Sequence, residues 1–349
     1  MCFICKETEN MKFNLTLQDT AVLKGIAICA MLLHHLFYEN PEYGHIIWHF
    51  ALLGKVCVAL FLFLSGFGLT VQFSKSTIHG LNINSGGHVL RFLLKRFLKF
   101  YLNYWVIFLI FVPIGVLFFN RPLVVPYGEH ANIFLALLKD VFGLQKFYSY
   151  NITWWFNQLI ITLWLLFPLF YLLIRNKYAS WILLPISMIF CPEKGLAFIL
   201  GIYIAMYREN VNHVIQKIGF SCSLFLIALI LVVLCVNREK MCVAWLSGTF
   251  ADPYIAMMLS IFVAVFTTRT SCKLPLFIFL GRHSMNMYMV HTFIFAYFFH
   301  DFIYGFKYPI FIFVALLLSS LAVSIVLEYG KRRLGLYSLL NYISSKLSA

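Results

Sequence analysis

The chain repeats one feature from end to end: apolar runs of membrane-spanning length, each bounded by charged or turn-forming residues. A helix needs roughly 20 apolar residues to cross the hydrocarbon core of a bilayer. The runs predict ten transmembrane helices, or eight if the short fifth and sixth merge into a re-entrant pair. The predicted spans are Thr20–Tyr38, Phe50–Phe73, Leu98–Phe119, Ile152–Ile174, Tyr178–Cys191, Gly195–Tyr207, Ile218–Val236, Pro253–Thr268, His283–Ile303 and Tyr308–Tyr329.

The composition agrees with a membrane protein. Of the 349 residues, 62% are hydrophobic and only 11% are charged, whereas a soluble protein carries about twice that share of charge. The formal net charge of +14 is scattered between the apolar runs, so membrane orientation explains it better than a nucleic-acid partner. We expect one all-α integral membrane domain over residues 1–349, with its spans between about residues 20 and 329.

Lysine and arginine set the expected orientation, because cytoplasmic loops keep an excess of them. With the N-terminus inside, the interior segments hold 17 of the 27 basic residues and the exterior loops hold 7. Lys24 and Lys55 fall within spans, and Arg282 directly precedes the ninth span. The distribution predicts that both termini are cytoplasmic.

The first predicted span carries ionisable groups, which are costly in hydrocarbon and therefore of functional interest. Lys24 and His35 are separated by roughly three helical turns, so they share one face about 16 Å apart along the axis. His34 points about 100° away from that face, and we expect it to form a hydrogen bond between helices. His35 is the candidate catalytic residue, because imidazole exchanges protons near neutral pH.

A basic segment, RFLLKRFLKFY, precedes the third span. At helical spacing Arg91, Lys95 and Lys99 form one stripe, and Arg96 lies beside it. Such a stripe suits the phosphates of a cytoplasmic, nucleotide-containing donor. Attraction to anionic lipid headgroups, together with topology control, explains the same charges. The sequence leaves both interpretations open.

Two groups of residues in the second and fourth spans could line a ligand site or only hold helices together. Ser65 stands beside Gly66, which allows a helix or a ligand to approach the backbone closely. Trp154 and Trp155 fit an interfacial aromatic belt, and they could equally stack on a sugar ring. Asn157 is a deeper polar group that needs a partner.

The ninth span brings a second imidazole into the membrane interior. Ser284, Tyr288 and His291 follow at steps of four and three residues, so they share one helix face. They could line a polar cavity, and structural hydrogen bonds between helices are the competing interpretation. The single CxxC of Cys2 and Cys5 has no second pair, so no metal site is predicted.

The longest exterior connection runs from Asn120 to Asn151. Within it, Ile133–Leu144 has the pattern of an amphipathic helix lying on the membrane surface. Such a helix could also cover an outward opening as a lid.

Four segments together resemble the acyltransferase 3 family of bacterial integral membrane acyltransferases. They are LKGIAICAMLLHH, FLFLSGF, KRFLKFY and LGRHSMNMYMVH, and the similarity extends from about Leu17 to Tyr329. The family's first-span pattern of an arginine, ten residues and a histidine falls on Lys24 and His35. Lysine keeps the charge of that arginine but loses its two-pronged geometry. The aspartate that relatives often carry three residues earlier is Ala21 here, and no role is carried over to Asp19.

The resemblance implies transfer of an acyl group, usually acetyl, from cytoplasmic acyl-CoA to a hydroxyl of a cell-surface glycan or lipid-linked sugar. It places the protein in the bacterial plasma membrane, with acyl-CoA as a donor substrate and no bound cofactor. His35 would act as general base, or carry the acyl group itself. Ser65, Asn157 and Tyr288 are candidates for stabilising the oxyanion. The alternative function is an exporter or flippase for the same glycans, and a structural scaffold leaves the histidine face unexplained.

Overall fold

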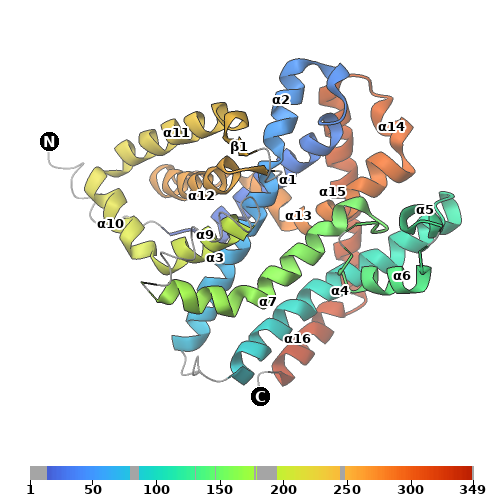
Figure 1. Cartoon of the computed structure of the whole chain (residues 1–349), viewed down its shortest axis with the longest axis horizontal. Coiled ribbons are helices and arrows are strands. Elements are labelled where there is room, and N and C mark those ends of the chain that lie inside the picture. Colours follow the sequence, from blue (N-terminus) through green and yellow to red (C-terminus); the bar gives the residue numbers. More distant parts are fainter. Residues whose placement is uncertain are drawn as a thin grey trace. The chain divides into compact units, whose positions relative to one another are not determined.

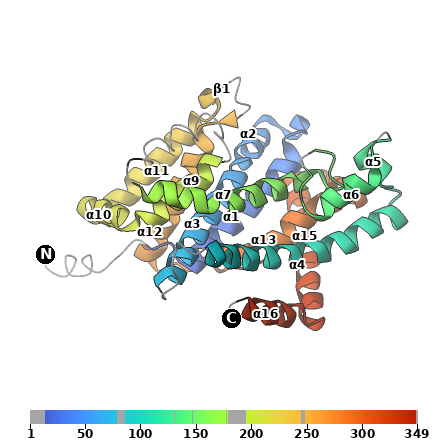
Figure 2. The same ribbon diagram turned by 60° about the horizontal axis from the view of Figure 1, so that its bottom comes forward.

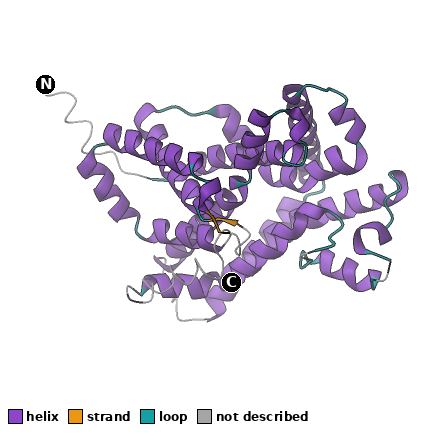
Figure 3. Ribbon diagram, turned by 45° about the horizontal axis from the view of Figure 1, so that its top comes forward, coloured by secondary structure: helices purple, strands orange, loops and turns teal. Residues whose placement is uncertain are grey.

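The computed structural model describes residues 14–78, 86–129, 131–145, 147–176, 178, 195–243 and 248–347. This part of the chain is helical except for its loops and one pair of two-residue strands (Figure 1; Figure 3). The elements are α1 (Leu17–Phe37), η1 (Pro41–Tyr43), α2 (His45–Gly54), α3 (Val56–Ile78), α4 (Gly86–Phe118), α5 (Val124–Tyr127), α6 (Ile133–Val141), η2 (Ile152–Trp154), α7 (Trp155–Arg175), α9 (Gly195–Met206), α10 (Arg208–Ile218), α11 (Phe220–Val236), η3 (Glu239–Met241), β1 (Cys242–Val243), β2 (Gly248–Thr249), α12 (Ala251–Thr270), α13 (Pro275–Thr292), the π-helix η4 (Phe293–Phe298), α14 (His300–Tyr304), α15 (Pro309–Arg333) and α16 (Leu336–Lys346).

The described helices support a multi-pass membrane protein. Six segments are long and apolar enough to cross a membrane, and a seventh arises if α10 and α11 form one bent span. The ten predicted spans and the cytoplasmic termini stay predictions, and the span predicted over Tyr178–Cys191 lies, Tyr178 apart, outside the described residues. The six segments are Leu17–Phe37, His45–Lys75, Gly87–Phe118, Ile152–Arg175, Ala251–Thr270 and Pro309–Arg333.

Two predicted boundaries are wrong, and a third agrees. The helix predicted from Leu98 begins at Gly86, so the basic stripe is part of α4 rather than of a loop. The span predicted over Ile218–Val236 agrees with α11 within two residues, and Gly219, whose φ is 88°, turns α10 into α11 at an angle of 108°. The ninth span is predicted from His283, whereas α13 begins at Pro275 and becomes a π-helix at Phe293.

The chain divides into two compact units, which are described separately. Unit 1 comprises residues 1–34, 49–79 and 167–282, and unit 2 comprises residues 35–48, 80–166 and 283–349. The single domain over residues 1–349 stays a prediction.

Glycines let the backbones of α3 and α9 meet in unit 1, where the two helices lie side by side (Figure 1). A Cβ atom added to Gly66 would lie 2.1 Å from the carbonyl oxygen of Phe198, and one added to Gly201 would lie 2.2 Å from that of Phe63. Both distances are far shorter than a van der Waals contact. The role of Gly66 in the described structure is therefore close helix packing, one of the two roles that its sequence context predicts.

We expect Gly66→Ala to lower the free energy of unfolding by about 2 kcal/mol, because its methyl group forces α3 and α9 apart. Gly68→Ala on the same helix is the matched control, since no atom lies within 4 Å of its added Cβ, and it should be neutral or slightly stabilising. Denaturant unfolding in detergent measures both. Equal stability of the two variants would contradict the packing role.

Two polar contacts hold α1 within unit 1. The Nδ1–H of His34 donates to the carbonyl oxygen of Ala51 in α2 at 2.8 Å, which confirms the predicted bond between helices. Asp19 is buried at the start of α1, where it accepts a bond from the hydroxyl of Thr267 in α12 at 2.7 Å. Asp19 therefore has a structural role at this helix end.

A buried ion pair joins the end of α11 to the start of α12. Arg238 donates to Asp252 through Nε at 2.6 Å and through Nη2 at 2.9 Å, and both side chains are about 5% exposed or less. The bidentate geometry satisfies both charges at once. Asp252 also lies in the first turn of α12, where its negative charge interacts favourably with the positive end of the helix dipole.

A polar network ties four helices of unit 2 together. Lys331 of α15 is 1% exposed, and its ammonium group donates to Glu328 at 2.7 Å, to Asn286 of α13 at 3.0 Å and to Asn103 of α4. Tyr337 of α16 donates to the other oxygen of Glu328. The network fixes α13 against α4 and α15, while α16 lies along α4 (Figure 2).

Asp140 fixes the connection from Asn120 to Asn151 in unit 2, which we call the exterior connection after its predicted side of the membrane. The connection contains α6, which begins at Ile133 as the amphipathic pattern predicts. The carboxylate of Asp140 is 1% exposed and accepts bonds from the Tyr127 hydroxyl, the Ser149 hydroxyl and the Tyr150 amide, at 2.8, 2.6 and 2.6 Å. Burial raises the pKa of Asp140, and these three donors oppose the shift.

We expect Asp140→Ala to loosen this connection by about 3 kcal/mol, because three buried donors lose their acceptor. Amide exchange over residues 140–150 should become about 100-fold faster, and it can be followed by mass spectrometry. Lys139→Ala is the neighbouring control, since that side chain is exposed. Unchanged exchange in the Asp140 variant would show that the apolar face of α6 alone holds the connection.

Candidate active site

Two imidazoles meet in unit 2, although 256 positions separate them in the sequence. His35 lies in the last turn of α1 and His291 in the last turn of α13. Their ring centroids are 5.0 Å apart and the ring planes are tilted by 42°. His291 is fully buried, and His35 is half-buried. Two imidazolium ions at this separation would repel each other, so at most one of the two rings carries a positive charge at a time.

Aromatic rings surround the pair. Phe295 of η4 stacks on His291 at 6.0 Å and lies 6.5 Å from His35. The Tyr288 ring is 6.3 Å from His291 and its hydroxyl donates to the carbonyl oxygen of Thr153 at 2.7 Å. π-helical turns such as η4 occur frequently at functional sites, because they aim side chains that a regular helix would turn away.

A chain of hydrogen bonds leads away from His291, through side chains that we call the hydroxyl chain: Thr292, Thr153 and Asn151. The Nδ1–H of His291 donates to the carbonyl oxygen of Tyr288 at 2.7 Å. Its Nε2 atom lies 3.2 Å from the Thr292 hydroxyl, which lies 3.1 Å from the Thr153 hydroxyl. Thr153 in turn donates to the amide oxygen of Asn151 at 2.8 Å.

The turn that carries Thr153 is docked directly on α13. The side-chain amide of Asn151 and the indole N–H of Trp154 both donate to the carbonyl oxygen of Met289 at 3.3 Å. Trp154 is 1% exposed and packs 5.0 Å from the Tyr104 ring. Trp154 is thus a core residue of unit 2, whereas the half-buried Trp155 lies beside Phe156, whose ring faces Tyr288.

Asn157 is the one predicted site residue whose polar atoms are buried without a partner among the described residues. The side chain is 0% exposed, and neither its amide nitrogen nor its amide oxygen has a hydrogen-bond partner there. An unsatisfied buried amide costs about 1–3 kcal/mol. Such a group calls for an explanation, and a ligand that pairs with it is one.

The predicted basic residues form a helical row on α4. Arg91 and Lys99 are exposed, and Lys95 and Arg96 are half-buried. The Arg96 guanidinium lies 4.7 Å from the centre of the Trp164 ring of α7, which adds a cation–π contact. All four residues lie on one continuous helix, as their predicted helical spacing requires.

The remaining predicted residues lie on α1, α3 and α13. Ser284 is buried on α13 one turn before Tyr288. Lys24, on α1, and Ser65 and Gly66, on α3, belong to unit 1. The structure thus brings together His35, His291 and Tyr288 from the predicted set.

An arginine on the exterior connection sits between aromatic rings. The Arg121 guanidinium lies 3.7 Å from the ring centre of Tyr297 and 5.4 Å from that of Tyr150, and Nη2 donates to the Tyr150 carbonyl oxygen at 3.2 Å. Burial raises the pKa of Tyr150 to about 12, although the arginine opposes the shift. Tyr297 belongs to η4, so the exterior connection and the imidazole pair contact the same short element.

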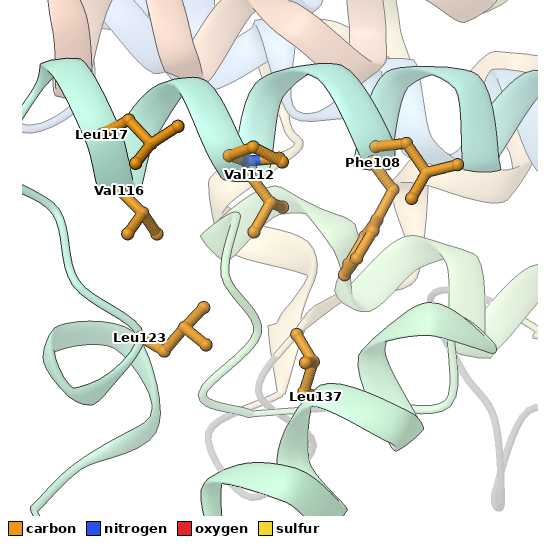
Figure 4. A pocket seen from close by; sticks show the side chains of 8 residues that line it. Phe108, Val112, Val116, Leu117, Leu123 and Leu137 are labelled. Atoms are coloured by element: carbon orange, nitrogen blue, oxygen red, sulfur yellow. The ribbon is translucent and has the colours of Figure 1, made fainter.

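The cavity in Figure 4 is separate from the residues of the hydroxyl chain and is lined by other side chains. It has a volume of about 360 Å³ and lies between the second half of α4 and the connection that carries α5 and α6. Only apolar side chains line it, so it offers no group that binds a thioester or an alcohol. The lining residues are Phe108, Leu109, Val112, Pro113, Val116, Leu117, Leu123 and Leu137.

Sequence reasoning missed the threonines and the asparagine of the hydroxyl chain. Thr292 directly follows His291, and Asn151 and Thr153 lie just before Trp154 and Trp155. Their position next to predicted site residues was the only sign in the sequence that they belong to the site. Phe295 gave no signal, because the chain has 38 phenylalanines.

Comparison with known proteins gives one result. No curated protein and no solved structure matches the chain. A family model described as an acyltransferase domain, Acyl_transf_3, matches residues 21–329, which include the imidazole pair and nearly the whole chain. The family match confirms the resemblance seen in the four sequence segments. The chain therefore belongs to the acyltransferase 3 family of membrane proteins.

Proposed function

We propose that this membrane acyltransferase moves an acetyl group from cytoplasmic acetyl-CoA to a hydroxyl of a cell-surface glycan or lipid-linked sugar. The observation that carries the proposal is the contact between His35 and His291 inside a member of this family. The pair supplies a base at a buried position, which transfer to an alcohol requires. The proposed location is the bacterial plasma membrane, with lipid, acyl-CoA and the acceptor as partners and no nucleic acid.

In the proposed reaction His35 takes the proton of the acceptor hydroxyl as its oxygen attacks the thioester carbon. The carbon–sulfur bond breaks, and the proton finally resides on the CoA thiolate. In the second route His35 first carries the acyl group and then passes it to the alcohol. Both routes leave an ester and free CoA.

The donor end of the proposal rests on the row of α4. Arg91, Lys95, Arg96 and Lys99 would pair with the phosphates of CoA, since arginine and lysine bind phosphate oxygens strongly. The role of Lys24 in binding acyl-CoA stays a prediction. Anionic lipid headgroups remain the competing partner for the row, and acyl-CoA binding that is unchanged in the charge-reversed variant Arg91→Glu/Lys99→Glu would favour them.

The oxyanion end of the proposal rests on Asn157. Its amide nitrogen is a donor without a partner in the described residues, as expected for a group that serves a transition state. The Tyr288 hydroxyl already donates to the Thr153 carbonyl oxygen, so it is less suited to this role. The roles of Ser65, Gly66, Trp154, Trp155 and Ser284 at the acceptor stay predictions.

The test separates acyl transfer from export. Purified protein in liposomes receives acetyl-CoA labelled in the acetyl group, and the release of free CoA and the labelling of added surface glycan are measured. Glycan mass analysis of cells that carry the wild type or His35→Ala then shows whether one acetyl mass is lost per repeat unit. Glycan movement across the liposome membrane without acetyl-CoA, and no labelled glycan, would support the exporter instead.

A further inference from the structure

We propose that His291 receives the proton that His35 removes from the acceptor, and that the hydroxyl chain of Thr292, Thr153 and Asn151 holds it there. The inference rests on the proposed function for the origin of the proton. His291, Thr292 and Thr153 are positioning residues in this scheme, because they act through His35.

The neutral form of His291 has a fixed tautomer. A carbonyl oxygen cannot donate a hydrogen bond, so the 2.7 Å contact between Nδ1 and the Tyr288 carbonyl oxygen requires a hydrogen on Nδ1. In a neutral imidazole Nε2 is then a bare acceptor. The atom that faces the hydroxyl chain is therefore the one that can take up a proton.

The chain contains one hydrogen fewer than its contacts need while His291 is neutral. Three contacts run in series, from Nε2 to Thr292, from Thr292 to Thr153 and from Thr153 to Asn151. Two hydroxyl groups supply only two hydrogens for them. The Asn151 amide oxygen has no hydrogen to donate, and it also accepts a bond from the Thr153 backbone N–H at 3.0 Å.

A proton on Nε2 completes the chain without moving any atom. The Nε2–H then donates to Thr292, Thr292 donates to Thr153, and Thr153 donates to the Asn151 oxygen. All three contacts now run in one direction and contain one hydrogen each. Bonds to a charged donor are the stronger ones, so the chain stabilises the imidazolium in particular.

The neighbours of His291 allow a charge that is held only briefly. The titratable groups whose rings meet it are His35 from α1 and Tyr288 from its own helix, and Phe295 and Thr153 carry no charge. No carboxylate contacts His291 among the described residues, so a full positive charge there remains costly. While His291 holds the proton, His35 is again neutral, and the proton returns through His35 to the departing thiolate.

The test compares hydroxyl removal on the chain with hydroxyl removal elsewhere on the same segment. Thr153→Val deletes the middle hydroxyl at nearly constant shape, and Thr153→Ser restores it. Thr162→Val in α7 is the control, because that exposed hydroxyl bonds to the Gln158 carbonyl oxygen of its own helix. Nitrogen-15 NMR of labelled histidines in lipid nanodiscs, with His291→Gln for assignment, follows the His291 tautomer and its titration.

We expect the Nδ1–H tautomer for neutral His291, and a titration midpoint that falls by roughly 0.5 pH units in Thr153→Val. Acetyl-CoA hydrolysis, with water as the acceptor, should lose about 5-fold in kcat with KM unchanged, and Thr153→Ser should recover. An Nε2–H tautomer, or a midpoint and kcat in Thr153→Val equal to those of Thr162→Val, would overturn the proposal. If wild type releases no CoA even with added glycan, the proposed function fails, and the NMR result alone decides on the chain.

Discussion

Replacing His35 by alanine lowers the rate of acyl transfer by about 10³-fold in our expectation, because the reaction loses its general base. The loss should appear in kcat more than in KM, since the ring acts on the proton in the transition state. Release of CoA from acetyl-CoA by the purified protein measures it, with and without added glycan. Labelled acetyl-CoA without acceptor separates the two routes: label retained on the wild type and absent from the variant would exclude the simple base mechanism.

His34→Ala is the matched control, because the two histidines are adjacent and equal in size. His34 donates to the Ala51 carbonyl oxygen, so its loss should cost about 1 kcal/mol of stability and leave kcat within about 3-fold of wild type. Equal losses of kcat at the two positions would mean that His35 has no special role, which would contradict both proposed routes.

Removing Asp252 has the largest effect on stability that we expect from a single substitution. Asp252→Ala leaves the Arg238 guanidinium buried and uncompensated, which costs about 3–5 kcal/mol. The free energy of unfolding in detergent measures the loss. Arg208→Ala is the control for a general charge effect, because its pair with Glu209 is exposed and 3.8 Å long, and such pairs contribute about 0–1 kcal/mol.

A double substitution shows whether the pair of Arg238 and Asp252 adds net stability to the fold, or whether each residue only compensates the buried charge of the other. Arg238→Met/Asp252→Leu removes both charges and keeps most of the volume, so stability should return to within about 1 kcal/mol of wild type. A double variant as unstable as Asp252→Ala would instead show that the bond network between α11 and α12 is itself required.

The helices were largely predictable from the sequence, and their ends were not. Apolar runs indicate what must lie in lipid, so α1 and α15 agree with prediction within three residues at the N-terminus. Helix breaks depend on single backbone angles, and the positive φ of Gly219 sets the angle between the polar α10 and the apolar α11. The start of α4 was missed because its first turns carry the basic residues that mark a loop in a hydropathy pattern.

The site was predictable residue by residue but not as an arrangement. Ionisable side chains are costly in hydrocarbon, and this cost points to His35 and His291. The helical repeat then predicts which neighbours share a helix face with each of them. Their contact depends on the packing of α1 against the end of α13, which no local pattern contains. Threonines are common in membrane helices, where their hydroxyls usually bond to a backbone carbonyl one turn earlier. Thr153 and Thr292 are therefore recognised as part of the site only because the structure shows their hydroxyls in contact.

The π-helix η4 at Phe293–Phe298 limits which insertions and deletions this chain can tolerate during evolution. A π-turn is the result of one extra residue in a helix, and deleting one residue there would rotate everything beyond it by about 100°. Tyr297 would then leave both Arg121 and the Ile152 amide, while Phe295 would leave the imidazoles. We expect homologous chains to vary in length at the exterior connection and to keep the residue count constant from His291 to Tyr297.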